Sequence, residues 1–94
     1  MKEYLVLIKD FTDPECINRR LSVREHHLTA NSLHKQNGNV MVLGGALADK
    51  DGRMVASSIV CKAETKEEVI EFLKNDIYVK SNVWDMSTLF ITEI

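Results

Sequence analysis

The sequence is poor in the residues that mark several protein classes. It has four glycines, one proline and two cysteines. So little glycine and proline excludes a collagen-like repeat and a low-complexity disordered chain. Cys16 and Cys61 lie far apart and form no CxxC pair. This excludes a disulfide framework and a cysteine-rich zinc site, and it indicates free thiols in a reducing compartment.

Long apolar runs and an excess of positive charge are also missing. The apolar run at 4–8 is closed by charged residues and is too short for a signal peptide or a membrane span. The formal net charge of −2 leaves no basic footprint for nucleic acid. We therefore expect a cytoplasmic protein that binds neither membrane nor nucleic acid.

What remains is typical of a folded globular chain, with 45% hydrophobic and 28% charged residues. At 94 residues we expect a single domain over 1–94. Apolar runs and turn signals alternate along it. Strands are expected at 4–9, 39–48, 53–62 and 83–93, helices at 13–36 and 65–75, and one more helical turn at 77–79. This β-α-β-β-α-β order predicts a ferredoxin-like α+β fold, in which both helices cover one face of a four-stranded antiparallel sheet.

Short capping and turn signals set these boundaries. Asp13-Pro14 is typical of a helix start and Asn37-Gly38 of a helix end. The stretch 49–52, Asp-Lys-Asp-Gly, predicts a hairpin turn. Thr65 and Glu68 fit a capping box, in which each side chain accepts a hydrogen bond from the other residue's backbone.

Both faces of the predicted sheet are apolar. In the first strand Tyr4, Val6 and Ile8 point one way, and Leu5 and Leu7 point the other. Two helices can cover only one face, so the second face must be buried against something else. We therefore expect a homodimer in which two copies pair through this face.

The first helix carries a polar stripe. Positions 17, 21, 28 and 32 share one side, which we expect to face the core. Beside it lie the stripe residues Arg20, Arg24, His27, Asn31 and His34. Such a stripe either lies in solvent and pairs with nearby carboxylates, or it binds a small anionic ligand.

Two glycines lie opposite this stripe. Counting residues along the helix and back along the next strand places Gly44 and Gly45 level with His27. Missing side chains there either leave room for a ligand or mark a β-bulge. Asp49 is the nearest carboxylate beyond the glycines, but it reaches His27 only if the strand bends, and it also suits a simple turn.

Several kinds of site lack a signal. The histidines show neither HxH nor HxxxH spacing, so we expect no metal. The glycines form neither GxGxxG nor a Walker motif, which argues against a nucleotide. No serine or cysteine is placed as a nucleophile, so covalent catalysis is not expected. We therefore expect no cofactor.

The chain resembles the YciI-like (YCII-related) proteins in three segments, 19–28 (RRLSVREHHL), 44–52 (GGALADKDG) and 75–84 (NDIYVKSNVW). The resemblance implies a dimeric α+β barrel with a histidine–aspartate dyad in a cleft. The histidine corresponds to His27 and the aspartate most plausibly to Asp49, while Arg24 matches a family arginine. Asp76 and Tyr78 match an Asp-Pro-Tyr segment in which Ile77 replaces the proline.

Three functions follow from these residues. The first is a cofactor-free lyase or isomerase, in which His27 and Asp49 perform acid–base chemistry on a small anionic substrate, cyclic and aromatic ones included. Arg20, Arg24, Asn31 and the two glycines would bind it. The second is a non-catalytic module that binds a small anion. The third is a structural dimer whose stripe makes only ion pairs.

Overall fold

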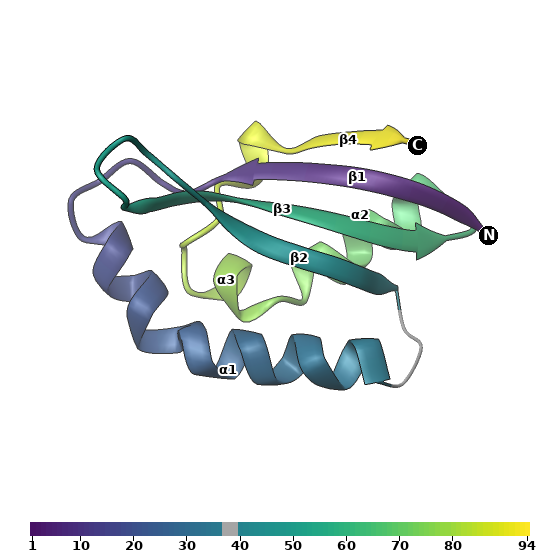
Figure 1. Ribbon diagram of the computed structural model, residues 1–94, viewed down its shortest axis with the longest axis horizontal. Coiled ribbons are helices and arrows are strands. Elements are labelled where there is room, and N and C mark those ends of the chain that lie inside the picture. The colour runs from purple at the N-terminus through teal and green to yellow at the C-terminus, as the bar shows by residue number, and fades with distance from the viewer. Residues whose placement is uncertain (37–39) are drawn as a thin grey trace.

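The computed structural model describes residues 1–36 and 40–94, and in this part the chain follows the predicted order. The strands form one antiparallel sheet in the order β2-β3-β1-β4. The helices lie on one side of the sheet, with α1 beside the edge strand β2 (Figure 1). The element bounds are β1 Lys2–Lys9, α1 Cys16–Gln36, β2 Met41–Ala48, β3 Met54–Ala63, α2 Lys66–Lys74, α3 Ile77–Lys80, the 3₁₀ turn η1 Met86–Thr88, and β4 Phe90–Glu93. The ferredoxin-like α+β fold is therefore confirmed.

The core lies between the sheet and the helices. Alternate residues of β1 and β3 point into it, because side chains alternate between the faces of a strand. From the other side α2 contributes Val69 and Leu73, both fully buried, and Trp84 closes the end of the core. Burying these side chains stabilises the fold by about 1.5–3 kcal/mol each. The buried apolar residues of these two strands are Tyr4, Val6, Ile8, Ile59, Cys61 and Ala63.

The last strand is shorter than predicted. The prediction placed it at 83–93, but β4 spans only Phe90–Glu93. Asp85 accepts hydrogen bonds from the backbone and the hydroxyl of Ser87, and this local bonding forms the 3₁₀ turn η1. Before it, Trp84 makes only an isolated bridge to Asp10. Local side-chain bonding therefore replaces the strand pairing that the apolar pattern suggested.

The capping signals are partly confirmed. Thr65 accepts from the backbone N–H of Glu68, but the Glu68 carboxylate accepts from Glu64 and not from Thr65. α1 begins at Cys16, after the predicted start; the Asp13 carboxylate bonds the Arg19 guanidinium and the backbone of Glu15, and the Asp13 carbonyl accepts from the Cys16 N–H. The predicted helix end at 37–38 lies outside the described residues. The turn after β2 is confirmed, with Gly52 at φ +82°.

The prediction of which side of α1 faces the core is wrong. Leu21 and Leu28 are 54% and 45% exposed, whereas Arg20, His27 and Asn31 are buried. An apolar side normally faces inward. Here Arg20, His27 and Asn31 of the polar stripe take that place: Arg20 and His27 bond Asp10 and Asp76 outside α1, and Asn31 bonds His27. Within the described part of the chain, no helix has the length and apolar character needed to cross a membrane.

Both thiols are expected to resist modification in the folded protein. Cys16 and Cys61 are buried and free. Burial raises the pKa of the Cys61 thiol from 9.0 to about 11, and the pKa of Cys16 is also raised, chiefly by burial. A higher pKa means less thiolate at a given pH, so Cys61 loses about a hundredfold in reactive form, in addition to its steric protection. At pH 8, labelling by a disulfide reagent should be far slower in buffer than in urea; equal rates would contradict this burial.

Candidate functional site

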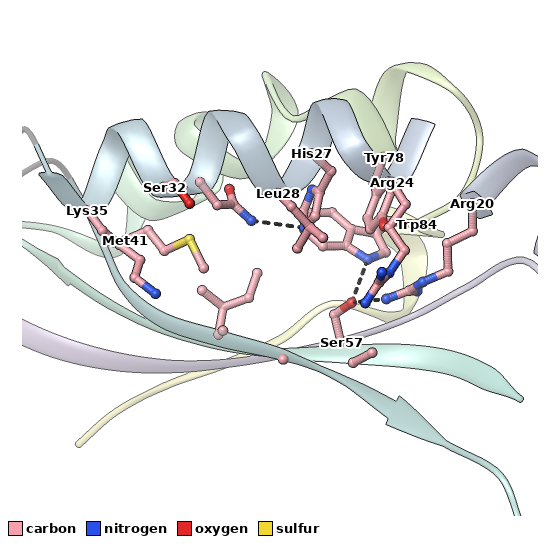
Figure 2. Close-up of a pocket in the computed structure, with 15 residues that line it drawn as sticks. Arg20, Arg24, His27, Leu28, Ser32, Lys35, Met41, Ser57, Tyr78 and Trp84 are labelled. Atoms are coloured by element: carbon pink, nitrogen blue, oxygen red, sulfur yellow. Dashed lines mark hydrogen bonds between the residues drawn. The ribbon is translucent and has the colours of Figure 1, made fainter. Parts of the chain in front are cut away.

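A cleft of about 450 Å³ opens between α1 and the sheet. Its helix wall includes Arg20, Arg24, His27 and Asn31 of the polar stripe, whereas His34 lines a different pocket. Its floor comes from β2 and β3, with Tyr78 and Trp84 closing one end (Figure 2). The cleft therefore brings together residues from both halves of the chain.

His27 is held through both ring nitrogens. Its Nδ1 lies 2.8 Å from Asp76 Oδ1, and its Nε2 lies 2.9 Å from Asn31 Nδ2. A carboxylate can only accept, so Nδ1 carries the proton and Nε2 accepts from the Asn31 amide. The His27 side chain is 10% exposed and the Asp76 side chain 8%. His27 is thus an oriented imidazole on the wall of the cleft.

The short helix α3 explains how Asp76 reaches the histidine. Asp76 is the N-cap of α3, and its Oδ1 accepts from the Tyr78 backbone N–H at 2.8 Å. The Tyr78 ring stacks on the His27 ring with centroids 3.8 Å apart and planes 8° apart. Trp84 packs edge-on against the same imidazole. One short segment therefore supplies both the acceptor and the stacking surface that fix the ring.

Tyr78 lines the cleft and is almost fully buried. Burial raises the pKa of Tyr78, while Arg20 and Arg24 partly oppose the shift. The hydroxyl therefore stays protonated at neutral pH and can donate a hydrogen bond.

Arg20, a predicted ligand-binding residue, is engaged within the protein. Its Nη1 bonds both carboxylate oxygens of Asp10 at 2.7 and 2.8 Å, and its Nη2 donates to Ser57 Oγ at 3.0 Å. The same hydroxyl oxygen accepts from the Trp84 indole at 3.1 Å. Arg20 lines the cleft, but Asp10 compensates its charge. Its main contribution is to hold the end wall in place.

Arg24 keeps its charge available. Its side chain lines the cleft, is exposed, and has no ion pair among the described residues. In Figure 2 it extends from α1 toward Ser57. No acidic residue is among the described residues that line the cleft. The cleft therefore favours an anion.

The predicted pairing of His27 with Asp49 is wrong. Asp49 lies in the turn between β2 and β3, where its carboxylate accepts from the backbone of Asp51 and Arg53. These bonds lower the pKa of Asp49, chiefly through the Arg53 N–H. Asp49 lines a different pocket, near Pro14 and Arg53. The strand does not bend at the glycines as the pairing required, so Asp76 takes the place assigned to Asp49.

Both predicted glycines line the cleft, but only at Gly44 would a side chain point toward α1. Gly44 pairs with Ile59, which is buried on the helix side of the sheet, and a Cβ on Gly44 would collide with the Met41 side chain. Gly45 pairs with Ser58, and a Cβ there would meet nothing within 4 Å. Because adjacent strand residues point to opposite faces, the missing side chain of Gly45 adds no room beside His27.

The sequence interpretation undervalued Asp76 and Tyr78. Both matched the family segment at 75–84, as did Trp84, but none of the three was assigned a role in the site. A signal against Asp49 was present, since straight-strand counting carried it past His27. The cleft residues Ser57 and Lys35 belonged to no motif.

The site can transfer protons, and its composition does not favour a resident metal. Among residues 1–36 and 40–94, no group of three or more His, Cys, Asp or Glu side chains is placed to hold a metal ion. An imidazole with a carboxylate on Nδ1 can accept a proton at Nε2 and stabilise the resulting charge. A base, a free guanidinium and a phenol thus share one cleft.

Several known proteins are similar to this chain in sequence or in structure. Fusaric acid biosynthesis protein 2 of Gibberella fujikuroi is 35% identical over 96 residues, covering 97% of this chain and 90% of that protein. The protein of the same name from Gibberella moniliformis matches equally well. Among solved structures, 5-chloro-2-hydroxyhydroquinone dehydrochlorinase (TftG) from Burkholderia phenoliruptrix AC1100, in complex with 2,5-dihydroxybenzoquinone, has a TM-score of 0.75 at 22% identity, covering 96% of this chain and 90% of that one.

The family model of the YCII-related domain matches residues 2–90. This range contains the whole cleft, from Arg20 to Trp84. The two Gibberella proteins are 35% identical to this chain over 97% of its length. The chain belongs to the YCII-related family.

Proposed function

We propose that this protein is an enzyme that uses His27 as an acid–base catalyst on a small anionic substrate, in an elimination or an isomerisation. The observation that carries the proposal is the 2.8 Å bond between His27 and Asp76 on the wall of a cleft with an uncompensated arginine. A substrate with a carboxylate, phenolate or enolate suits Arg24, because a guanidinium binds such groups through paired hydrogen bonds.

The proposed reaction begins with the substrate displacing the Asn31 amide from Nε2. His27 then removes a proton from the substrate carbon and becomes an imidazolium, which Asp76 stabilises through Nδ1. In an isomerisation the imidazolium returns the proton to another carbon; in an elimination the electron pair expels the leaving group. Arg24 and the Tyr78 hydroxyl would bind the oxygen on which negative charge develops.

The relatives support small-molecule chemistry. TftG is named as a dehydrochlorinase, which removes the elements of hydrogen chloride from a hydroquinone, and its structure holds a quinone. The Gibberella relatives are named for the biosynthesis of fusaric acid. A cofactor-free cleft for one small ring or chain agrees with all three names.

The test is a screen for proton exchange. The protein is incubated in D₂O with a panel of small phenols, enols and keto acids, 5-chloro-2-hydroxyhydroquinone included, and deuterium incorporation and product formation are followed by proton NMR. We expect at least one compound to exchange or react faster than in protein-free buffer. If compounds bind but none exchanges or reacts, the enzyme proposal fails and a binding module replaces it.

One observation favours that second candidate. Asn31 already donates to Nε2, so both nitrogens of His27 are occupied in the ligand-free structure. A binding module needs no free base, and it would use the same cleft and the same Arg24 to retain an anion. Here His27→Gln would weaken ligand binding, and the ligand would be recovered chemically unchanged.

We also propose that two copies pair through the uncovered sheet face. Many side chains on this face are apolar, and several are exposed, such as Leu43 at 60% and Phe90 at 52%. A soluble monomer rarely leaves such an apolar patch in water. A twofold arrangement buries the face of each copy against the other. The apolar residues at its centre are Leu5, Leu7, Leu43, Leu47, Val60 and Phe90, and Ser58 and Thr92 lie among them.

This pairing predicts a dimer in sedimentation at micromolar concentration. Leu43→Glu should dissociate it, because it would bury two carboxylates in the interface. Leu21→Glu is the matched control, since Leu21 is similarly exposed, at 54%, but lies on α1. A stable wild-type monomer would contradict the proposal.

A further inference from the structure

A second cation lies at the far end of the cleft. Lys35 lines it from the last turn of α1. In Figure 2 its side chain runs from the helix toward β2, and its amino group ends in the space between helix and sheet. Lys35 has no ion pair within the part of the chain that the structure describes. The cleft therefore has one uncompensated cation toward each end.

The spacing of the two cations sets a length. Arg24 and Lys35 are eleven residues apart on α1, which corresponds to roughly 16 Å along the helix axis. His27 lies between them, one turn from Arg24 and about two turns from Lys35. A substrate held at both ends would therefore present a position near its Arg24 end to the imidazole.

Between His27 and Lys35 the sheet side of the cleft is apolar. Met41 and Ile59 line it there and are buried, at 6% and 4% exposure, while Asn31 and Ser32 line the helix side. The two apolar side chains offer no hydrogen bonds, so this side suits a hydrocarbon segment. Along α1 the cleft thus has a cation, a middle section with an apolar floor, and a second cation.

We propose that the substrate of this cleft is a dicarboxylate, with one carboxylate on Arg24, the other on Lys35, and an apolar segment between them. The inference rests on the proposed function, because it places the reacting carbon beside His27. A single cation at each end matches singly charged carboxylates better than phosphates, which would bring more charge than each end can balance.

Trp84 makes this testable without a known substrate. It is the only tryptophan of the chain and lines the cleft. Its fluorescence can be followed at low salt during titration with linear dicarboxylates from succinate to sebacate, and with the monocarboxylate of each length. We expect the best dicarboxylate to bind about fivefold more tightly than its matched monocarboxylate, the effect of one exposed ion pair.

The variants separate the two ends. Lys35→Met should remove the dicarboxylate advantage and leave monocarboxylate binding unchanged, whereas Arg24→Met should weaken both. Lys50→Met is the control, since Lys50 lies in the exposed β2–β3 turn.

Each outcome has a separate meaning. Monocarboxylates that bind through Arg24 with no gain from a second carboxylate overturn this inference and leave the proposed function standing. A dicarboxylate advantage that persists in Lys35→Met also overturns it. If neither class binds, the inference fails together with the anionic substrate of the proposed function. If the tighter binding of dicarboxylates depends on Lys35 but the NMR screen shows no turnover, this inference is supported and the proposed enzymatic activity is contradicted.

Discussion

Replacement of His27 by glutamine is expected to lower kcat by about 100- to 10,000-fold on a substrate found by the exchange screen. Glutamine keeps a polar side chain of similar reach but cannot take up a proton at neutral pH. KM should change little, because Arg24 remains to bind the anion. The measurement is steady-state kinetics, with circular dichroism to show that the variant is folded. Unchanged kcat would remove His27 from the mechanism.

Two control variants and one variant of the partner aspartate make this test specific. His26→Gln should leave kcat unchanged, since His26 is exposed and does not line the cleft. Asp76→Asn should lower kcat by about tenfold to a hundredfold, because it removes the charge that stabilises the imidazolium. Asp49→Asn should have no effect, since Asp49 lies in the hairpin turn. The reverse order for the two aspartates would restore the pairing that the sequence suggested.

Arg20→Met is expected to cost about 3–5 kcal/mol of the free energy of unfolding. The side chains of Arg20 and Asp10 are only 3% and 5% exposed. Removing the guanidinium leaves the Asp10 carboxylate buried without its partner and takes a donor from Ser57. Urea denaturation followed by Trp84 fluorescence gives the measurement, since Trp84 packs at this site.

The neighbouring arginine provides the matched control. Arg19 also pairs with an aspartate, but its side chain and that of Asp13 are 32% and 46% exposed. Arg19→Met should cost much less stability, because water solvates the remaining carboxylate. If both variants lose the same stability, burial of the Arg20 pair is not what makes it matter.

A double variant tests the cause of the loss. Burial raises the pKa of Asp10 even though Arg20 opposes the shift, so desolvation outweighs the attraction between the two charges. Replacing both residues, in Arg20→Met/Asp10→Leu, should therefore recover most of the stability lost in Arg20→Met. Failure to recover it would show that the pair itself, and not the unpaired carboxylate, holds the end wall.

The buried polar side chains of α1 are consistent with a functional site. A helix usually buries its apolar side, but α1 turns Arg20, His27 and Asn31 inward and leaves Leu21 exposed. Arg20 and His27 are held by partners outside α1, Asp10 and Asp76, and Asn31 bonds His27 within the helix. Such an arrangement costs desolvation and suits a site whose groups must keep fixed positions.

Much of the fold could be predicted from the sequence, because its signals are local. Alternating apolar residues set β1 and β3, the Asp-Gly turn sets the β2–β3 hairpin, and Thr65 begins α2. The errors are local too. The apolar pattern extended the last strand through 83–89, where the Asp85 side chain instead bonds the backbone into a 3₁₀ turn.

The site could be predicted only in part. Helical periodicity placed Arg20, Arg24, His27 and Asn31 on one stripe, and the structure keeps them along one cleft. The hydrogen-bond partners of these residues could not be predicted from periodicity, because Asp76 lies 49 residues beyond His27 and Asp10 follows the end of β1. Periodicity describes one element at a time and contains no information about which element packs beside it.

The order of the elements, the polar stripe of α1 and the apolar centre of the second sheet face could be predicted from the sequence alone, since each depends on residue spacing within one segment. The packed structure was needed to show that Arg20, His27 and Asn31 of the stripe are buried, that Asp76 and not Asp49 holds His27, and that only Gly44 of the two glycines faces α1. Those outcomes depend on how α3 and β2 pack against α1. Packing joins residues whose separation along the chain says nothing about their distance in space.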